Sequence, residues 1–153
     1  TDTFPQDMIH EMKCAAIFCK IAEGGNPFSG TAATVFNMAT LHAAKALGRE
    51  DLGRIAPGAK ADLIIVDTNN IECAPLRDPI KVLVYTATSK NIAKVIVDGN
   101  IVAQNGAPVG VDLEKLQQDM QAAGERMWAN VPQRDYLQRT AEEISPMSFP
   151  VKD

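Results

Sequence analysis

The stretch from Ala39 to Asp67 constrains the fold most, because it passes from a helical pattern to a strand-like one within a short distance. Small apolar residues up to Leu47 suit a helix, and Gly48 is the residue type that commonly follows a helix end. Leu63–Val66 is a short apolar run, typical of a strand covered on both faces. Between the two parts, Pro57-Gly58 presets a tight turn. The chain therefore combines helices with strands.

Two helices are expected around and before this transition. Apolar residues at helical spacing between Asp7 and Glu23, followed by Gly24-Gly25, predict the first. The second should begin after Ser29 or Thr31, since either side chain can cap it, and should stop at Gly48.

A β-hairpin is expected farther along the chain. Ala93–Val97 and Ile101–Ala103 flank Asp98-Gly99-Asn100, and Asp-Gly between two apolar runs is among the better hairpin signals. Ile80–Ala87 could form a helical turn or a strand, and its pattern does not decide between them.

The C-terminal part is expected to be helical. A helix is predicted from Asp112, its cap, to Val131, with Pro132 ending it. Its apolar residues lie three or four positions apart: Leu113, Leu116, Met120, Ala123 and Met127. A last short helix is predicted near Asp135–Glu143, followed by an irregular tail.

Length and composition exclude several classes of protein. A chain of 153 residues that is 46% apolar can form a core, but a complete (β/α)8 barrel needs about 250 residues. The net charge of −4 offers no basic field for a nucleic acid. No apolar run reaches the ~20 residues of a membrane span, and no signal-peptide pattern opens the chain, so a cytoplasmic protein without a membrane partner is expected.

The residues that could carry chemistry are few. Two histidines, His10 and His42, lie outside any H-x-H or H-E-x-x-H pairing, so we interpret both as helix residues rather than metal ligands. Cys14, Cys19 and Cys73 lack zinc or redox spacing and are expected to be buried, reduced thiols. Signatures of the zinc nucleoside deaminases, serine hydrolases, phosphate loops and dinucleotide-binding folds do not occur.

Several motifs nevertheless occur in a characteristic order. Thr1-Asp2-Thr3 is followed by Asp7–Lys13, then by the helix that ends at Gly48. Leu52–Leu63 contains Pro-Gly and Lys-Ala-Asp, and Val95–Val102 contains Val-Asp-Gly. In this order the motifs resemble the C-terminal part of the metal-dependent amidohydrolases, in the chlorohydrolase and aminohydrolase (cytosine-deaminase-like) branch.

This resemblance implies an α+β arrangement of three parts. Residues 1–48 would be the last helices of a (β/α)8 amidohydrolase barrel. Residues 49–110 would form a small composite β domain of about three to five strands, and residues 111–153 a C-terminal helical extension. In the complete enzyme, strands from an earlier part of the chain would join this sheet, so an unpaired edge is expected here. The chain would then be the tail of an enzyme rather than a whole one.

The resemblance also implies a role for Asp2, which corresponds to the family's aspartate at the mouth of the barrel. There a carboxylate serves as a ligand of a divalent metal, zinc or iron, and as the acid and base that moves a proton to the leaving nitrogen. From the residues alone, Asp2 is only a charged residue near a terminus. The family's other ligands are histidines on earlier strands, so this chain by itself is expected to bind no metal and to be inactive.

The implied activity is hydrolysis of a carbon–nitrogen bond other than a peptide bond. The branch indicates deamination or dechlorination of a small nitrogen heterocycle such as a triazine, purine or pyrimidine. Two alternatives stay open: a non-catalytic helical and β-hairpin interaction module, and the C-terminal subunit of a split enzyme. In each case, uncovered apolar faces are expected to cause self-association.

Overall fold

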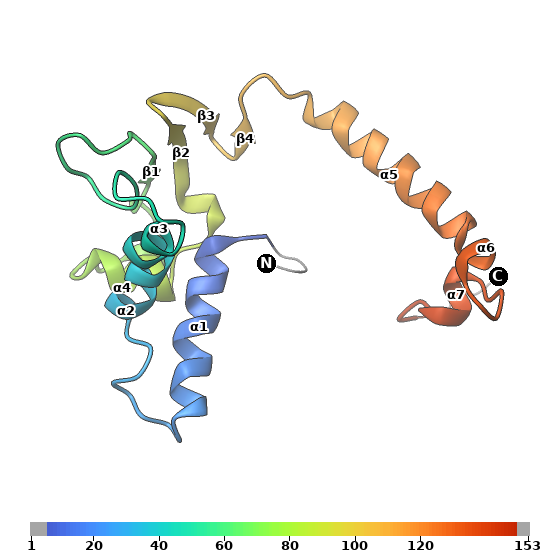
Figure 1. Ribbon diagram of the computed structural model, residues 1–153, viewed down its shortest axis with the longest axis horizontal. Coiled ribbons are helices and arrows are strands. Elements are labelled where there is room, and N and C mark those ends of the chain that lie inside the picture. Colours follow the sequence, from blue (N-terminus) through green and yellow to red (C-terminus); the bar gives the residue numbers. More distant parts are fainter. Residues whose placement is uncertain (1–5, 150–153) are drawn as a thin grey trace. The chain divides into compact units, whose positions relative to one another are not determined.

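The computed structural model describes residues 6–149, and the chain divides into two compact units, one up to Val109 and one from Gly110 (Figure 1). The first unit holds helices and a four-stranded antiparallel sheet, and the second is helical. The predicted combination of helices and strands is confirmed.

The first helix is α1, Met8–Ala22, as the sequence predicts. It begins at Asp7, whose Oδ1 accepts from the backbone N–H groups of Ile9 at 2.9 Å and His10 at 3.2 Å. These bonds satisfy donors that have no partner within the helix. Gly24 and Gly25 follow with φ of 66° and 86°, so the predicted stop is confirmed.

The second helix is interrupted, which the sequence pattern did not show. α2, Ala32–Asn37, is capped by Thr31, whose Oγ1 accepts from the N–H of Thr34 at 3.3 Å. The chain then passes through a π-helical turn, η1, Met38–His42, into α3, Ala43–Ala46. Gly48, with a φ of 68°, follows α3 as predicted.

The sheet has the order β1-β2-β3-β4, with β1 at one edge. Its strands are Leu63–Val66, Ile92–Val97, Asn100–Gln104 and Ala107–Pro108. The hairpin of β2 and β3 is confirmed, and Asp98 and Gly99 form its turn with φ of 48° and 81°. Positive φ at both turn residues matches the twist of the flanking strands.

The expectation that β1 is covered on both faces was wrong. Ile64 and Ile65 are each 47% exposed. β1 pairs with β2 alone, so it is an edge strand of an antiparallel sheet, and such a sheet does not need to be covered on both faces.

The predicted turn at Pro57-Gly58 is confirmed. Gly58 has a φ of 82°, and Ala59 N–H donates to the Ala56 carbonyl at 3.1 Å. This turn lies within a loop between residues 47 and 62, which joins the helical part to β1. The undecided segment at 80–87 is a helix, α4, Pro79–Tyr85, capped by Asp78. Two 3-10 turns, η2 (Ile71–Cys73) and η3 (Ser89–Asn91), flank α4.

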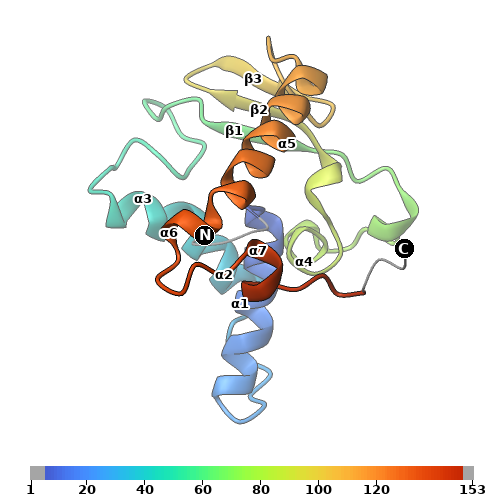
Figure 2. The ribbon, with the colours of Figure 1, turned by 90° about the vertical axis from the view of Figure 1, so that its right-hand side faces the viewer.

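The core of the first unit lies where α1, α2 and α4 meet, and the three helices are adjacent in Figures 1 and 2. Val35 and Val84 are 1% and 0% exposed. The buried cluster consists of Ile9, Met12, Ala16, Ala32, Val35, Leu83, Val84 and Ala87. Val66 of β1 and Ile92 of β2 pack against it, so the sheet is joined to the helices at one end of these two strands.

The cysteines only partly match the prediction of buried, reduced thiols. All three are free, but only Cys73 is buried, at 1% exposed, whereas Cys14 and Cys19 are partly exposed. They lie on α1 outside its buried stripe, which a pattern of apolar residues alone cannot distinguish. Among residues 6–149, no helix is long and apolar enough to cross a membrane.

The second unit contains α5, Leu113–Ala129, α6, Val131–Arg134, and α7, Ala141–Ile144. As predicted, Asp112 caps α5, and its Oδ1 accepts from Lys115 N–H at 3.0 Å. α5 ends before Pro132, which lies in the first turn of α6.

The predicted helix at 135–143 was wrong over most of its length. The Asp135 carboxylate accepts from the backbone N–H groups of Leu137 and Arg139 and from the guanidinium of Arg139. An aspartate side chain that bonds nearby backbone groups competes with helix formation, so a turn replaces the helix. Only α7, capped by Thr140 and Glu143, is helical.

Candidate functional site

The signature motifs of the sequence meet in space at the tip of the β2–β3 hairpin. Lys60 Nζ lies 2.8 Å from Asp98 Oδ1, and Asp62 Oδ1 accepts from Asp98 N–H at 2.8 Å. Gly99 N–H donates to the Ala61 carbonyl at 3.1 Å. Lys-Ala-Asp and Asp-Gly therefore form one interlock between the segment just before β1 and the hairpin turn. The pKa of Lys60 is raised by its hydrogen bond to Asp98, which favours the charged form.

A second contact joins the π turn to the loop that carries the same motif. Gly53 has a φ of 74°, and a Cβ at this position would lie 2.6 Å from the Thr40 carbonyl oxygen. Only glycine allows the backbone to approach that closely. Thr40 Oγ1 in turn donates to the Phe36 carbonyl at 2.8 Å, which satisfies an acceptor next to the π turn.

The loop between Gly48 and Lys60 is held by a bidentate ion pair. Arg49 Nε and Nη2 each lie 2.7 Å from an oxygen of Asp51. The hydrogen bond from Arg49 lowers the pKa of Asp51 to about 2. Lys60 N–H donates to the Asp51 carbonyl at 2.8 Å, so a backbone hydrogen bond joins this part of the loop to the start of the interlock.

An apolar cleft of about 450 Å³ lies within the first unit, between its helices and its sheet. Met12 and Phe36 line it from the helices, and Ile64 and Ile96 line it from the sheet. Its polar lining residues are Thr40 and Asp62, the first of which hydrogen-bonds to Phe36 and the second to the hairpin. The cleft is suited to contact another apolar surface. Its lining residues do not include a nucleophilic side chain hydrogen-bonded to a general base.

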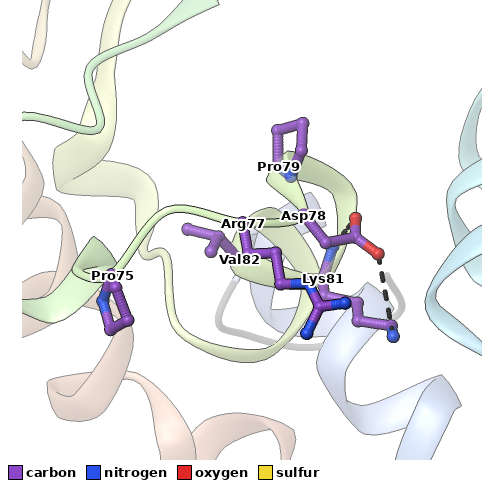
Figure 3. A pocket seen from close by; sticks show the side chains of 6 residues that line it. All are labelled: Pro75, Arg77, Asp78, Pro79, Lys81 and Val82. Atoms are coloured by element: carbon purple, nitrogen blue, oxygen red, sulfur yellow. Dashed lines mark hydrogen bonds and ion pairs between the residues drawn. The ribbon is translucent and has the colours of Figure 1, made fainter.

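A second pocket, of about 600 Å³, lies at the start of α4. Figure 3 shows the side chains that line it. Asp78 Oδ1 accepts from the N–H groups of Ile80 and Lys81 at 3.1 Å, and Lys81 Nζ lies 3.7 Å from Asp78 Oδ2. Arg77 adds a second cation to the lining. The Asp78 carboxylate therefore caps α4 and pairs with Lys81, so the contacts in this pocket serve the start of the helix.

The predicted metal and catalytic residue, Asp2, lies outside the described residues. His10 and His42 are exposed on α1 and η1, in agreement with their interpretation as helix-surface residues. His10 Nε2 lies 3.3 Å from Cys14 Sγ one turn along α1. Within residues 6–149, no three His, Cys, Asp or Glu side chains are grouped so as to hold a metal ion, so the described residues do not fit a metal centre by themselves.

Within residues 6–149, the sequence patterns therefore meet as an interlock and a loop contact. The family model described as "Amidohydrolase family" matches residues 1–102. The chain belongs to the amidohydrolase family.

Individual amidohydrolases are similar to the chain over most of its length. A 5-methylthioadenosine/S-adenosylhomocysteine deaminase of Acetivibrio thermocellus is 36% identical over 122 residues, which is 79% of this chain and 28% of that protein. An adenosine deaminase of Xanthomonas campestris with bound zinc has a TM-score of 0.73 and 31% identity, over 78% of this chain and 27% of that one. For an atrazine chlorohydrolase of Arthrobacter aurescens complexed with zinc, the TM-score is 0.67 and the identity 29%, over 74% of this chain and 25% of that one.

The chain thus spans about a quarter of the length of the amidohydrolases it matches. Its fold is that of a fragment related to the (β/α)8 amidohydrolases. The sequence patterns did not show that Lys60 and Asp62 engage Asp98. Opposite charges in two motifs nearly forty residues apart were the available signal, but only the antiparallel register of β1 and β2 brings them together.

Proposed function

We propose that the protein containing this chain is a metal-dependent hydrolase that removes the amino group from a purine nucleoside. The similarity to a 5-methylthioadenosine/S-adenosylhomocysteine deaminase, at 36% identity over 122 residues, carries the proposal. Among the solved structures, the adenosine deaminase has a TM-score of 0.73 and the atrazine chlorohydrolase one of 0.67, at 31% and 29% identity, which favours deamination over dechlorination.

We also propose that this chain contributes scaffold rather than a complete active centre. Residues 1–48 would end the barrel, residues 49–110 would form the small composite β domain, and residues 111–153 would extend it with helices. The interlock of Lys60 and Asp62 with Asp98 and the contact of Gly53 with Thr40 support this assignment, because they join consecutive segments firmly. On this proposal the chain by itself does not hydrolyse the nucleoside.

Asp2 remains the proposed ligand and proton-transfer residue. A divalent metal, zinc or iron, would supply a water of lowered pKa in the whole enzyme. Both solved neighbours cited above contain zinc, which supports a divalent metal here. The carboxylate of Asp2 is suited to accept a proton and to return it to a leaving amine.

The test compares the complete polypeptide with the 153-residue chain, each with added zinc or iron(II). We expect the complete protein to release ammonia from 5′-methylthioadenosine, and the chain alone to release none. Replacement Asp2→Asn in the complete protein should reduce turnover by about 10²–10⁴-fold, the usual contribution of a general acid or base.

Asp7→Asn is the matched control, because asparagine caps a helix about as well as aspartate, so turnover should persist. If the complete protein released chloride from atrazine but no ammonia from a nucleoside, the proposed deamination would be wrong and the reaction would be dechlorination. Metal-dependent turnover by the 153-residue chain alone would contradict the scaffold role. Activity that appears only after mixing with a separate histidine-rich chain would identify a split enzyme.

A further inference from the structure

The side chain of Lys20 joins three segments of the first unit. Its Nζ donates to the carbonyl oxygens of Ala16 and Gly30, each at 2.9 Å, and to the hydroxyl oxygen of Tyr85 at 3.3 Å. Ala16 belongs to α1, Gly30 to the connection between α1 and α2, and Tyr85 to α4. An ammonium group has three N–H donors, so these three acceptors use all of them. The Lys20 ammonium also lies 5.6 Å from the centre of the Tyr85 ring.

The connection, residues 23–31, lies directly against α1 at the point where Lys20 binds it. A Cβ at Gly30 would be 2.6 Å from the Cys19 Cβ and 3.2 Å from the Ala16 carbonyl oxygen. Gly30 is buried, and among the described residues its carbonyl oxygen accepts from Lys20 alone. A buried acceptor that loses its donor costs free energy, because it is also removed from water. Lys20 therefore fixes the end of the connection from which α2 starts.

The earlier part of the connection is shaped by local hydrogen bonds. Gly25 N–H donates to the Lys20 carbonyl at 2.8 Å, at the end of α1. The N–H groups of Phe28 and Ser29 donate to Asn26, at 3.0 Å and 3.2 Å. Figure 1 shows the connection leaving the end of α1 and turning back to α2. The local bonds form its turns, but they do not join it to α4.

We propose that Lys20 is a clasp that keeps residues 23–31 closed against α1 and α4, and that this connection opens locally when the ammonium is replaced by a neutral group. The charge matters because a hydrogen bond from an ammonium is stronger than one from a neutral donor. All the groups of the clasp belong to the first unit, and the proposal does not depend on the reaction that the whole protein catalyses. A segment held by a few polar bonds can open while the apolar core stays folded.

The test measures amide hydrogen exchange in the complete protein, by mass spectrometry of peptides that cover residues 23–31. Lys20→Met keeps a long side chain but removes the charge and all three donors. We expect exchange in residues 23–31 to accelerate about tenfold, while exchange around the buried Val84 stays unchanged. Lys13→Met is the matched control, because it makes the same change about 10 Å earlier along α1 and should leave residues 23–31 unaffected.

Tyr85→Phe tests the clasp while Lys20 is retained. It removes one acceptor, so exchange in residues 23–31 should accelerate about two- to threefold. In the Lys20→Met background it should add nothing, because the hydroxyl then has no ammonium to bind. The proposal would be overturned if Lys20→Met left this exchange unchanged, or if Lys13→Met accelerated it equally. It would also be overturned if Tyr85→Phe had the same effect with and without Lys20.

Discussion

The close approach of Gly53 to Thr40 makes this glycine hard to replace. Gly53→Ala adds a Cβ at 2.6 Å from a backbone oxygen, at a φ of 74°. We expect a loss of about 3 kcal/mol in the free energy of unfolding, from strain and overlap together. Gly58→Ala is the control, because its φ is 82° but nothing lies within 4 Å, so about 1 kcal/mol is expected. Equal urea midpoints for the two variants would contradict the contact.

The Arg49–Asp51 ion pair predicts a pH dependence with a defined sign. The folded chain lowers the pKa of Asp51 to about 2, below its ordinary 3.8, because Arg49 hydrogen-bonds the charged form. The pair therefore stabilises the fold above about pH 4, and this stabilisation is lost as the pH falls towards 2. Arg49→Gln should return the Asp51 pKa, followed by NMR, towards its ordinary value. A carboxyl that titrates alike in both forms would exclude the pair in solution.

Individual residues were predictable where their role is local. Asp112 caps α5 as predicted, and Thr31, one of two predicted candidates, caps α2, because capping depends on a few neighbouring positions. The exposure of Cys14 and Cys19 was not predictable, since it depends on which face of α1 the other helices cover. Asp2 could be proposed only from the resemblance, because its chemistry requires groups that local pattern does not supply.

At the scale of elements, the interlock between β1 and the hairpin can be tested directly. Asp62→Ala removes the acceptor for Asp98 N–H and should lower the free energy of unfolding by about 1 kcal/mol. Asp62→Asn retains an amide oxygen that can accept the same bond and should cost less. Hydrogen exchange at Asp98 N–H should accelerate in the alanine variant. Unchanged exchange there would show that the bond does not form in solution.

Helices and strands were likewise predictable where their causes are local in the sequence, and not where they depend on distant segments. The hairpin of β2 and β3 was predictable because Asp-Gly alone selects the turn. The faces of β1 and the break of the helix at Met38–His42 were not, because both depend on segments that pack against them. The helix predicted at 135–143 was wrong for a local reason. The Asp135 carboxylate accepts hydrogen bonds from the N–H groups of Leu137 and Arg139 and holds this segment as a turn.

At the scale of the whole molecule, stability is concentrated where the helices of the first unit meet. Val84 is fully buried there, so Val84→Ala should cost about 2 kcal/mol through lost burial and a cavity. Val102 on β3 is 40% exposed, and the same truncation should cost less than about 1 kcal/mol. Denaturant unfolding of the two variants gives the comparison. Similar costs would mean that the sheet contributes as much as the helical core.

The interlock also limits what can be inferred about a protein's reaction from the motifs that it shares with a family. Lys60, Asp62 and Asp98 bond to one another, so they stabilise the fold of a chain whether or not that chain carries out a reaction. A lineage could exchange one substrate for another, or become inactive, while these residues stayed in place. Their presence in an unfamiliar chain is therefore a record of ancestry, and its chemistry has to be established from other residues.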